Sequence, residues 1–395
     1  MISEKAKRIT PSPTLAIDSK YKEMKANGED AVGFGVGEPD FDTPSYIKEA
    51  AVAAMMAGQT KYTPAAGTME LRKAVADKFL RENGISYQPT QIVVSNGAKH
   101  SLMNAFLAIL NAGDEVLIPS PYWVSYPEMV KLADGVPIAV KTREDNDFKA
   151  TVADFEKALT PKTKAIILNS PSNPTGMVYT EEEIRKIADF AVKNDLYVIS
   201  DEVYEHLIYE GKHISIASLG DEIKERTITI NGVSKTYAMT GWRIGFAAAN
   251  DKIAKAMASI QSHGASNPNS IAQAATVAAL RGGLSEVEKM RGEFEKRRDF
   301  FVDAINATDG VSCRKPQGAF YIMMNLDGVL GKSYNGEKIK NSDDFARLFL
   351  ETEKVAVVPG TGFDAPNYVR WSYAVDIDSI KEGVKRLRHF LESLK

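Results

Sequence analysis

The 395-residue sequence contains a single cysteine, Cys313. One thiol cannot form an internal disulfide, which argues against a disulfide-stapled extracellular fold and for a reducing compartment. No run of about 18 apolar residues occurs, so a membrane-spanning helix is not expected. The opening stretch MISEKAKRITPSP has no long apolar segment, so we expect no secretory signal and a cytoplasmic protein.

Neither sign of charge dominates the sequence. The 49 Lys and Arg residues and 52 Asp and Glu residues give a formal net charge of −3 at pH 7. This balance argues against nucleic acid or an anionic membrane as the main partner. Hydrophobic residues make up 44% of the chain, enough for a sizeable core. At about 100–200 residues per domain, the length predicts two domains.

Several catalytic motifs are absent from the sequence. There is no H-E-x-x-H, G-x-S-x-G or P-loop. The segment GFGVGE (33–38) reads G-x-G-x-G and precedes the strand-rich region, so it is not the dinucleotide fingerprint. We therefore discard a dinucleotide-dependent oxidoreductase. Metal-ligand spacing is missing from the histidines, so no metal site is expected; they are His100, His206, His213, His263 and His389.

From about residue 91, short apolar runs alternate with helical patterns. The runs are QIVVSN, EVLIPS, KAIILNS, LYVISDE, TITINGVS and RIGFAAA. Helices are predicted over 97–110, 123–132, 152–158, 181–194 and 217–224, after earlier ones over 13–27, 45–58 and 69–83, whereas 32–44 is predicted to be a loop. The alternation predicts an α/β fold with a mostly parallel sheet flanked by helices. Ligands of such sheets bind at the carboxyl ends of the strands.

The pattern changes after about residue 281. A charged helix, SEVEKMRGEFEKRRDFFVDAI, is followed by the short strands GAFYIMMN and KVAVVPG and by a last helix, DIDSIKEGVKRLRHFLESL. This order is typical of a smaller α+β domain, with which the N-terminal helix is expected to pack. We assign residues 1–14 to an N-terminal arm, 15–46 and 291–395 to the discontinuous small domain, and 47–290 to the large domain.

Polar residues of unusual choice follow the predicted strands. In SNGAKHS (95–101), the amides of residues 95–97 are either an anion site at a helix N-terminus or an ordinary cap. Trp123 in SPYWVSYP belongs either to the core or against a planar ligand. The turn cluster NSPSNPTG (169–176) makes Asn173-Pro174 a candidate for a cis peptide bond.

The last two strand ends carry the strongest signal. Asp201 and Tyr204 follow an apolar strand in SDEVY, although a carboxylate there is also explained as a helix cap. In SKTYAMTGWRIGF (234–246), Lys235 ends a strand and Arg243 follows it closely. A lysine that forms a covalent bond beside a phosphate-binding arginine needs this setting. Together the strand ends supply the groups that a pyridinium aldehyde phosphate requires.

The motifs give the chain a resemblance that runs nearly end to end. They are VGEPDFDTP, KYTPAAG, SNGAK, PYWVSYPEM, NSPSNPTG, SDEVYE, SKTYAMTGWRIG, GAFY and YVRWSYA. In this order they resemble the pyridoxal-phosphate-dependent aminotransferases of the aspartate aminotransferase family (class I, fold type I). The resemblance implies pyridoxal 5'-phosphate (PLP) as cofactor, amino acids and 2-oxo acids as substrates, and a homodimer with sites shared across the interface.

The resemblance also implies roles for the cofactor site. Lys235 would form the Schiff base and move the substrate proton, and burial beside Arg243 would keep its amine available. Asp201 would pair with the pyridinium nitrogen. The remaining cofactor contacts would be Asn173 and Tyr204 with the phenolate oxygen, Trp123 with the ring, and Gly97, Ala98, Ser234 and Arg243 with the phosphate, which Tyr62 of the neighbouring subunit would also reach.

Substrate contacts follow from the same resemblance. Arg370 in YVRWSYA would clamp the α-carboxylate, together with the Gly37 amide. Trp123 and Asn173 would border the substrate, and Phe320 would line the pocket. The segment before Arg370, PGTGFDAPNYVR, departs from the family's usual spacing, which leaves the shape of that loop open.

The distal carboxylate of aspartate or glutamate needs a cationic partner when buried. One branch of the family uses an arginine from the partner subunit, which segment 260–270 lacks. Another branch uses a lysine after the phosphate nest, which here is Lys99, although a solvated lysine is the alternative. Thr14 is a further candidate for the lining. Relatives that accept prephenate tend to carry a lysine where this chain has Thr10.

The resemblance therefore predicts transfer of the amino group from L-aspartate to 2-oxoglutarate, giving oxaloacetate and L-glutamate. A broader aminotransferase that accepts aromatic amino acids, alanine or prephenate is the nearest alternative. From another class, a non-catalytic PLP-binding regulator stays open, although such proteins usually carry an extra DNA-binding segment for which this chain has no room.

Overall fold

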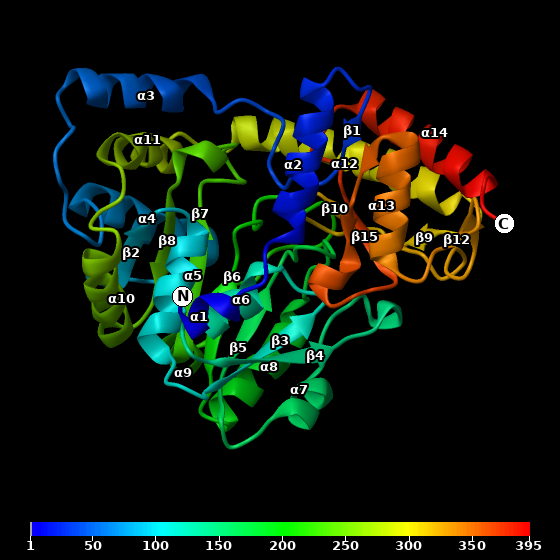
Figure 1. Ribbon diagram of the computed structural model, residues 1–395. Coiled ribbons are helices and arrows are strands. Elements are labelled where there is room, and N and C mark those ends of the chain that lie inside the picture. The colour runs from blue at the N-terminus through cyan, green and yellow to red at the C-terminus, as the bar shows by residue number, and fades with distance from the viewer. Residues whose placement is uncertain (1) are drawn as a thin grey trace.

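The computed structural model describes residues 2–395 (Figure 1). The helices are α1 (Glu4–Lys7), α2 (Pro13–Ala26), α3 (Ser45–Met56), α4 (Met69–Asn83), α5 (Ala98–Ile109), α6 (Ser125–Leu132), α7 (Val152–Ala158), α8 (Glu181–Lys193), α9 (Asp221–Arg226), α10 (Asp251–Gly264), α11 (Ser270–Arg281), α12 (Ser285–Asn306), α13 (Ser342–Glu353) and α14 (Ile377–Glu392). The strands are β1 (Val32–Gly33), β2 (Ile92–Ser95), β3 (Glu115–Ser120), β4 (Val136–Lys141), β5 (Thr163–Asn169), β6 (Tyr197–Asp201), β7 (Thr227–Gly232), β8 (Gly245–Ala248), β9 (Ser312–Cys313), β10 (Tyr321–Asn325), β11 (Ser333–Tyr334), β12 (Glu337–Lys338), β13 (Val355–Ala356), β14 (Val358–Pro359) and β15 (Tyr368–Ser372).

The central sheet has the strand order β2-β8-β7-β6-β5-β3-β4. Strands β7, β6, β5, β3 and β4 run parallel to one another, and β8 is antiparallel to both β2 and β7. The predicted α/β class with a mostly parallel sheet is confirmed. Because the parallel strands end at one edge, the polar residues that follow them are brought together there.

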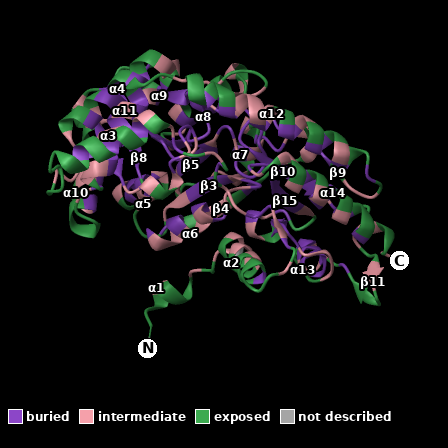
Figure 2. Cartoon of the chain, turned by 90° about the horizontal axis from the view of Figure 1, so that it is seen from above, coloured by how far each residue is buried: buried purple, intermediate pink, exposed green. Residues whose placement is uncertain are grey.

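Helices cover both faces of this sheet. Val116 and Ile118 of β3 pack with α5, α6 and α10, whereas Leu117 between them packs with α8 on the other face. This alternation follows from the two-residue period of a strand. Figure 2 shows buried residues gathered on the strands and exposed residues on the outward sides of the helices, with α1 and α2 beside the main body.

The C-terminal part of the chain forms a second, smaller sheet with its own helices, on the right of Figure 1. Its antiparallel sheet has the order β14-β15-β10-β9, and α12, α13 and α14 pack around it in one hydrophobic cluster. The N-terminal helix α2 contacts β1, β13 and β14. The domain boundaries given above remain our proposal. Among the described residues, no helix has the length and apolar character needed to cross a bilayer.

Several elements differ from the sequence prediction. The helix expected over 217–224 is two short pieces, a 3-10 turn at Ile216–Leu219 and α9, because Gly220 has a φ of 147° that no helix accepts. The strand KVAVVPG divides into β13 and β14, which belong to different sheets. Strand β4 was not among the expected strands; it contains Pro137, which an edge strand tolerates. Helices α10 and α11 were not expected either.

Candidate active site

A cavity of about 450 Å³ opens where the parallel strands end. Most residues that the sequence predicted for the cofactor or substrate line it, although they come from segments far apart in the chain. They are Thr14, Gly37, Ala98, Lys99, Trp123, Asn173, Asp201, Tyr204, Ser234, Lys235, Arg243 and Arg370. Three of the predicted residues are not part of the lining of this cavity: Gly97, Phe320 and Tyr62.

Lys235 is partly buried, and its Nζ donates to the carbonyl oxygen of Gly37. Burial lowers the pKa of Lys235 to about 8, and the positive charges of Arg370 and Arg243 act in the same direction. The carboxylates of Glu38 and Asp201 oppose this shift. The sequence analysis expected burial and Arg243 to favour the neutral amine; in the structure burial is the largest cause, and Arg370 is a second positive charge that was not expected. A nucleophilic amine is therefore available near neutral pH.

Asp201 ends β6 and is almost completely buried. The Tyr126 hydroxyl donates to its Oδ2 at 2.7 Å, and the Val203 N–H donates to its Oδ1 at 3.3 Å. Burial nevertheless raises the pKa of Asp201 to about 6. A buried carboxylate of this kind gains from a cationic partner inside the cavity, and a protonated pyridine nitrogen is such a partner.

Arg370 is 1% exposed and comes from β15. Its Nη1 donates to Asn173 Oδ1 at 3.0 Å, its Nη2 donates to the Gly35 carbonyl at 2.7 Å, and its Nε has no partner. No carboxylate of the described chain pairs with it, and burial lowers its pKa. The Asn173-Pro174 bond is cis, as the sequence analysis suggested. A buried guanidinium without an acidic partner is suited to a ligand carboxylate.

The start of α5 and the Arg243 side chain form the candidate phosphate site. Arg243 is exposed, its Nη1 donates to the Thr240 carbonyl at 2.9 Å, and no carboxylate of the described residues pairs with it. The Gly97 N–H donates to the Ser95 carbonyl at 2.8 Å, so of the two amides expected to bind the phosphate only that of Ala98 is left for an anion. Ser234 borders the cavity.

The candidate phosphate site needs the space that two glycines leave, Gly97 and Gly245. A Cβ on Gly97 would meet the Arg243 guanidinium, and a Cβ on Gly245 would meet the Ala98 amide nitrogen. Gly97 also has a φ of 85°, which favours glycine. Gly97 therefore shapes the candidate anion site by lacking a side chain, whereas the sequence analysis gave its amide the binding role.

Lys99 lies in the exposed part of the lining, with its Nζ 4.8 Å from the centre of the Trp123 ring. No carboxylate among the described residues pairs with it. Desolvation and the charge of Arg243 lower its pKa. Lys99 is thus a second cationic group that faces the cavity without an acidic neighbour. Thr10 lies outside the lining, and its N–H donates to Glu128 at 3.0 Å.

Tyr62 and Phe320 take positions away from the cavity. Tyr62 is 91% exposed, which is consistent with a contact to another subunit. Phe320 is fully buried behind Tyr204, with ring centres 5.6 Å apart. The next residue, Tyr321, lines the cavity instead. Contrary to the expectation, Phe320 is therefore not in the lining: it lies in the turn before β10, where Ala319 has a φ of 55°, and its ring centre is 5.8 Å from Lys235 Nζ.

The sequence reasoning missed other residues of the lining. Tyr126 could have been found from its spacing, since it comes three residues after Trp123 in the helix predicted over 123–132, and the ring centres of the two side chains are 5.3 Å apart. Asn169, at the end of β5, accepts from the Asn173 N–H at 2.8 Å and donates to the Asp201 carbonyl at 2.9 Å. Glu38, next to Gly37 in VGEPD, also lines the cavity.

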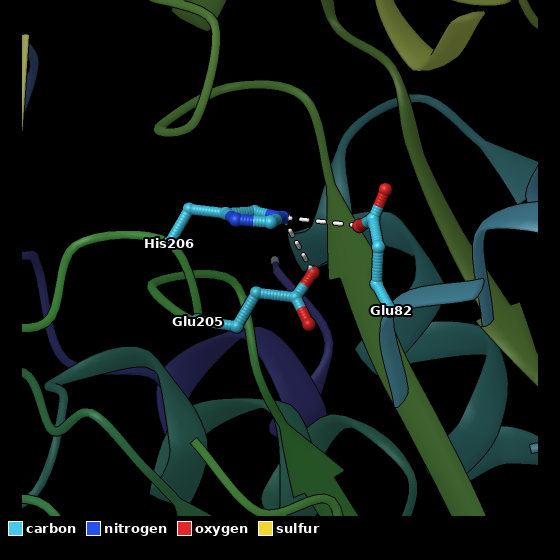
Figure 3. A group of neighbouring side chains, drawn as sticks. All are labelled: Glu82, Glu205 and His206. Atoms are coloured by element: carbon cyan, nitrogen blue, oxygen red, sulfur yellow. Dashed lines mark hydrogen bonds and ion pairs between the residues drawn. The ribbon is translucent and has the colours of Figure 1, made fainter. Parts of the chain in front are cut away.

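A cluster of ionisable groups lies outside the cavity, around Glu205 (Figure 3). His206 Nε2 is 3.1 Å from Glu82 Oε2 and 3.6 Å from Glu205 Oε1. These atoms are close enough for a metal ion. However, the buried Lys78 Nζ contacts Glu205 and lies 3.6 Å from Glu82. The lysine ammonium supplies the positive charge there, so the cluster is an ion-pair network in this structure.

Comparisons with known proteins support one family. Residues 29–387 match the family described as aminotransferase class I and II. The chain is 48% identical over 392 residues to the aspartate aminotransferase of Bacillus subtilis (strain 168), with 99% of both chains covered. It is 46% identical to the probable aspartate/prephenate aminotransferase of Aquifex aeolicus (strain VF5) over 396 residues, 100% of this chain and 99% of the relative.

Comparison with solved structures supports the same family. The aspartate aminotransferase from Rhizobium meliloti has a TM-score of 0.97 and 42% identity, with both chains fully covered. The Thermus thermophilus aspartate aminotransferase with maleate has a TM-score of 0.94 and 43% identity, covering 98% of this chain and 99% of the other.

Proposed function

The chain belongs to the aminotransferase class I and II family and is a PLP-dependent aminotransferase of fold type I, and we propose that L-aspartate is its amino donor and 2-oxoglutarate its acceptor. The products are oxaloacetate and L-glutamate. One observation carries the choice of substrate: Arg370 and Lys99 both face one cavity without an acidic partner among the described residues. Two such cations suit a substrate with two carboxylates.

The residues present fit PLP. The buried Asp201 carboxylate suits the ring nitrogen, and the Ala98 N–H and the Arg243 guanidinium suit the phosphate. Asn173 and Tyr204 supply polar groups for the phenolate oxygen, and Trp123 supplies a flat face for the ring. When bound, PLP supplies an aldehyde for covalent capture of an amine and a ring that delocalises the electron pair left by proton removal.

Side chains and one backbone amide of the protein carry out proton transfer and substrate binding. Lys235 Nζ is the nucleophile that holds the cofactor and the base that moves the proton of the substrate α-carbon. Arg370 binds the α-carboxylate, together with the Gly37 amide, and Lys99 binds the distal carboxylate. Because a single site serves both half-reactions, the first oxo acid leaves before the second substrate binds.

We also propose that the chain works as a homodimer in the cytoplasm. Tyr62 is 91% exposed, and Val52, Met55 and Met56 of α3 are at least half exposed. Apolar side chains grouped in this way are typical of a protein interface. In the dimer, Tyr62 of each protomer would reach the phosphate in the other protomer's site.

A spectrum of the purified protein with PLP tests the assignment. We expect a visible absorption band that L-aspartate bleaches at a lower concentration than L-phenylalanine or L-alanine. A band that responds best to another amino acid would retain the aminotransferase and reject aspartate. A protein whose band responds to none of them would match the non-catalytic regulator.

Prephenate is a second candidate acceptor, because the Aquifex aeolicus relative is named for both aspartate and prephenate. Position 10 weighs against it, since Thr10 offers no charge and its N–H is already bonded to Glu128. Adding prephenate to the aspartate-bleached protein decides the point. Return of the visible band at a concentration similar to that needed for 2-oxoglutarate would show that prephenate is accepted.

A further inference from the structure

Tyr321 contacts two residues of the proposed active site, and we propose that it is a positioning residue for both: it holds the Tyr204 hydroxyl and the Arg370 guanidinium. The inference rests on the proposed function, in which Tyr204 serves the cofactor and Arg370 serves the substrate. Tyr321 is the first residue of β10, is 1% exposed and lines the cavity. None of the roles proposed above uses it.

The first contact joins two hydroxyl groups. Tyr321 Oη and Tyr204 Oη lie 2.8 Å apart, and both rings are buried. Either hydroxyl can be the donor in this pair. If Tyr321 donates, the proton of Tyr204 is free for an oxygen in the cavity, and the accepted bond makes Tyr204 a stronger donor. Tyr321 thereby fixes both the direction and the strength of the Tyr204 hydrogen bond.

The second contact stacks a cation on a ring. The Arg370 guanidinium carbon is 4.5 Å from the centre of the Tyr321 ring. Strands β10 and β15 pair antiparallel with Met323 opposite Arg370, so the Tyr321 and Arg370 side chains lie on the same face of the sheet. Because Arg370 has no carboxylate partner among the described residues, the ring supplies part of the stabilisation that a salt bridge would otherwise give.

The backbone opposite leaves space for this arrangement. A Cβ on Gly37 would collide with the Tyr321 hydroxyl. The glycine thus allows the hydroxyl to sit between the carboxylate-binding backbone and Tyr204. A side chain at position 37 would push Tyr321 away from both of its contacts.

Two variants separate the two contacts. Tyr321→Phe removes only the hydroxyl, and Tyr321→Leu also removes the ring under Arg370. Tyr373→Phe is the matched control, because Tyr373 is fully buried in the same part of the fold and its hydroxyl donates to the Ala319 carbonyl, at 3.2 Å, and not to Tyr204. For each protein, the measurements are the pH midpoint of the visible absorbance with PLP bound and the dissociation constant for maleate, a dicarboxylate without an amino group.

Tyr321→Phe should raise the absorbance midpoint by roughly 0.5 pH units, because a weaker Tyr204 hydrogen bond stabilises the phenolate less. Its maleate affinity should stay within about twofold of the wild type, since the ring under Arg370 is retained. Tyr321→Leu should show the same midpoint shift and bind maleate about tenfold more weakly. Tyr373→Phe should change neither quantity.

An unchanged midpoint in Tyr321→Phe overturns the proposal, and so does unchanged maleate affinity in Tyr321→Leu. If the leucine variant does not fold, Tyr321→Met gives the same comparison with a side chain that fills irregular space. Failure of the proposed function is distinguishable in the wild-type protein, which would then give no visible band with PLP or a band that L-aspartate does not bleach. If there is no band, both the function and the role of Tyr321 are rejected.

Discussion

Arg370 and Asn173 lie 197 positions apart in the chain, yet Arg370 Nη1 donates to Asn173 Oδ1 at 3.0 Å. This bond ties the guanidinium proposed for the substrate carboxylate to the amide proposed for the cofactor. Since Arg370 makes no ion pair within the described chain, its charge is available for a ligand. One hydrogen bond therefore joins the residue proposed to bind the substrate carboxylate to a residue proposed to bind the cofactor.

Arg370→Ala should weaken amino-acid binding far more than PLP binding. Loss of a buried charge that meets a substrate carboxylate should raise the KM for aspartate by about 100-fold or more. Steady-state kinetics and a PLP titration measure the two effects. Arg298→Ala is the control, because Arg298 is equally buried but bonds to the Pro316 carbonyl and Asp299. A drop in PLP affinity with aspartate binding intact would refute the carboxylate role.

The strand ends could be predicted from the sequence because each apolar run stops at a polar residue. Asp201 is the last residue of the mostly buried strand β6, Lys235 follows the fully buried strand β7, and the parallel order of the sheet brings them into one cavity. Short-range patterns were sufficient here. The identity of the strands and the polar residues after them required no knowledge of the three-dimensional contacts.

Other features depended on contacts that no local pattern encodes. Tyr126 and Tyr321 are aromatic residues in apolar segments, where a core position is the ordinary expectation. Whether the cavity is lined by Phe320 or Tyr321 depends on where the strand starts, and a shift of one residue exchanges them. The engagement of the Gly97 amide with Ser95 depends on turn geometry that the letters SNGAK do not specify.

Lys235→Ala should abolish aminotransferase activity, with a loss of about 10⁴-fold or more, because the nucleophile and the proton carrier are removed together. The fold should persist, since burial already disfavours the charged form of this lysine. Circular dichroism and the melting temperature check the fold, and coupled assay of oxaloacetate checks the activity. Substantial remaining turnover would overturn the assignment of Lys235.

Lys99→Ala should harm aspartate selectively. Removing a charge-assisted contact to the distal carboxylate should lower kcat/KM for aspartate by roughly 10- to 100-fold. Alanine and phenylalanine lack that carboxylate, so their values should change little. Lys131→Ala, which removes a partly buried lysine paired with Glu128, is the control for the loss of positive charge. An equal loss for all amino acids would show that Lys99 serves the cofactor or the fold.

The pKa of Lys235 predicts a pH dependence of cofactor capture. The folded pKa of about 8 is below the usual value of 10.5, so the neutral amine dominates above pH 8. The rate of PLP capture by cofactor-free protein should rise about tenfold per pH unit below that point and level off above it. The unfolded chain binds more protons between pH 8 and 10.5, so this lysine makes stability increase with pH across that window.

Glu38→Gln provides the test of this electrostatic origin. The Glu38 carboxylate raises the pKa of Lys235, so its removal should move the midpoint of the capture profile to lower pH. Glu144→Gln, which removes a carboxylate outside the cavity lining, should leave the midpoint in place. Stopped-flow absorbance across the pH range measures both. A shift to higher pH in Glu38→Gln would contradict the assignment of the midpoint to Lys235.

The ion-pair network around Glu205, of which Figure 3 draws Glu82, Glu205 and His206, predicts a large cost for losing one lysine. That lysine is Lys78, whose side chain is 3% exposed and contacts the equally buried Glu205. Burial alone would raise the pKa of Glu205, but Lys78 and the nearby histidines hold it well below its usual value. Lys78→Met should lower the free energy of unfolding by about 3–5 kcal/mol, because it leaves Glu205 buried without this partner. Urea unfolding measures the change.

Lys149→Met is the matched control for this loss. Lys149 is also buried, but its partner Glu183 is 34% exposed and can be solvated by water, so the cost should be smaller. The double variant Lys78→Met/Glu205→Gln should recover most of the stability, because no unpaired charge remains. The cost of Lys78→Met should also shrink as the pH falls and Glu205 takes up a proton, since the carboxylate then needs no cation. If the double variant is no more stable than Lys78→Met, the packing of the lysine stem, and not its charge, is what the network requires.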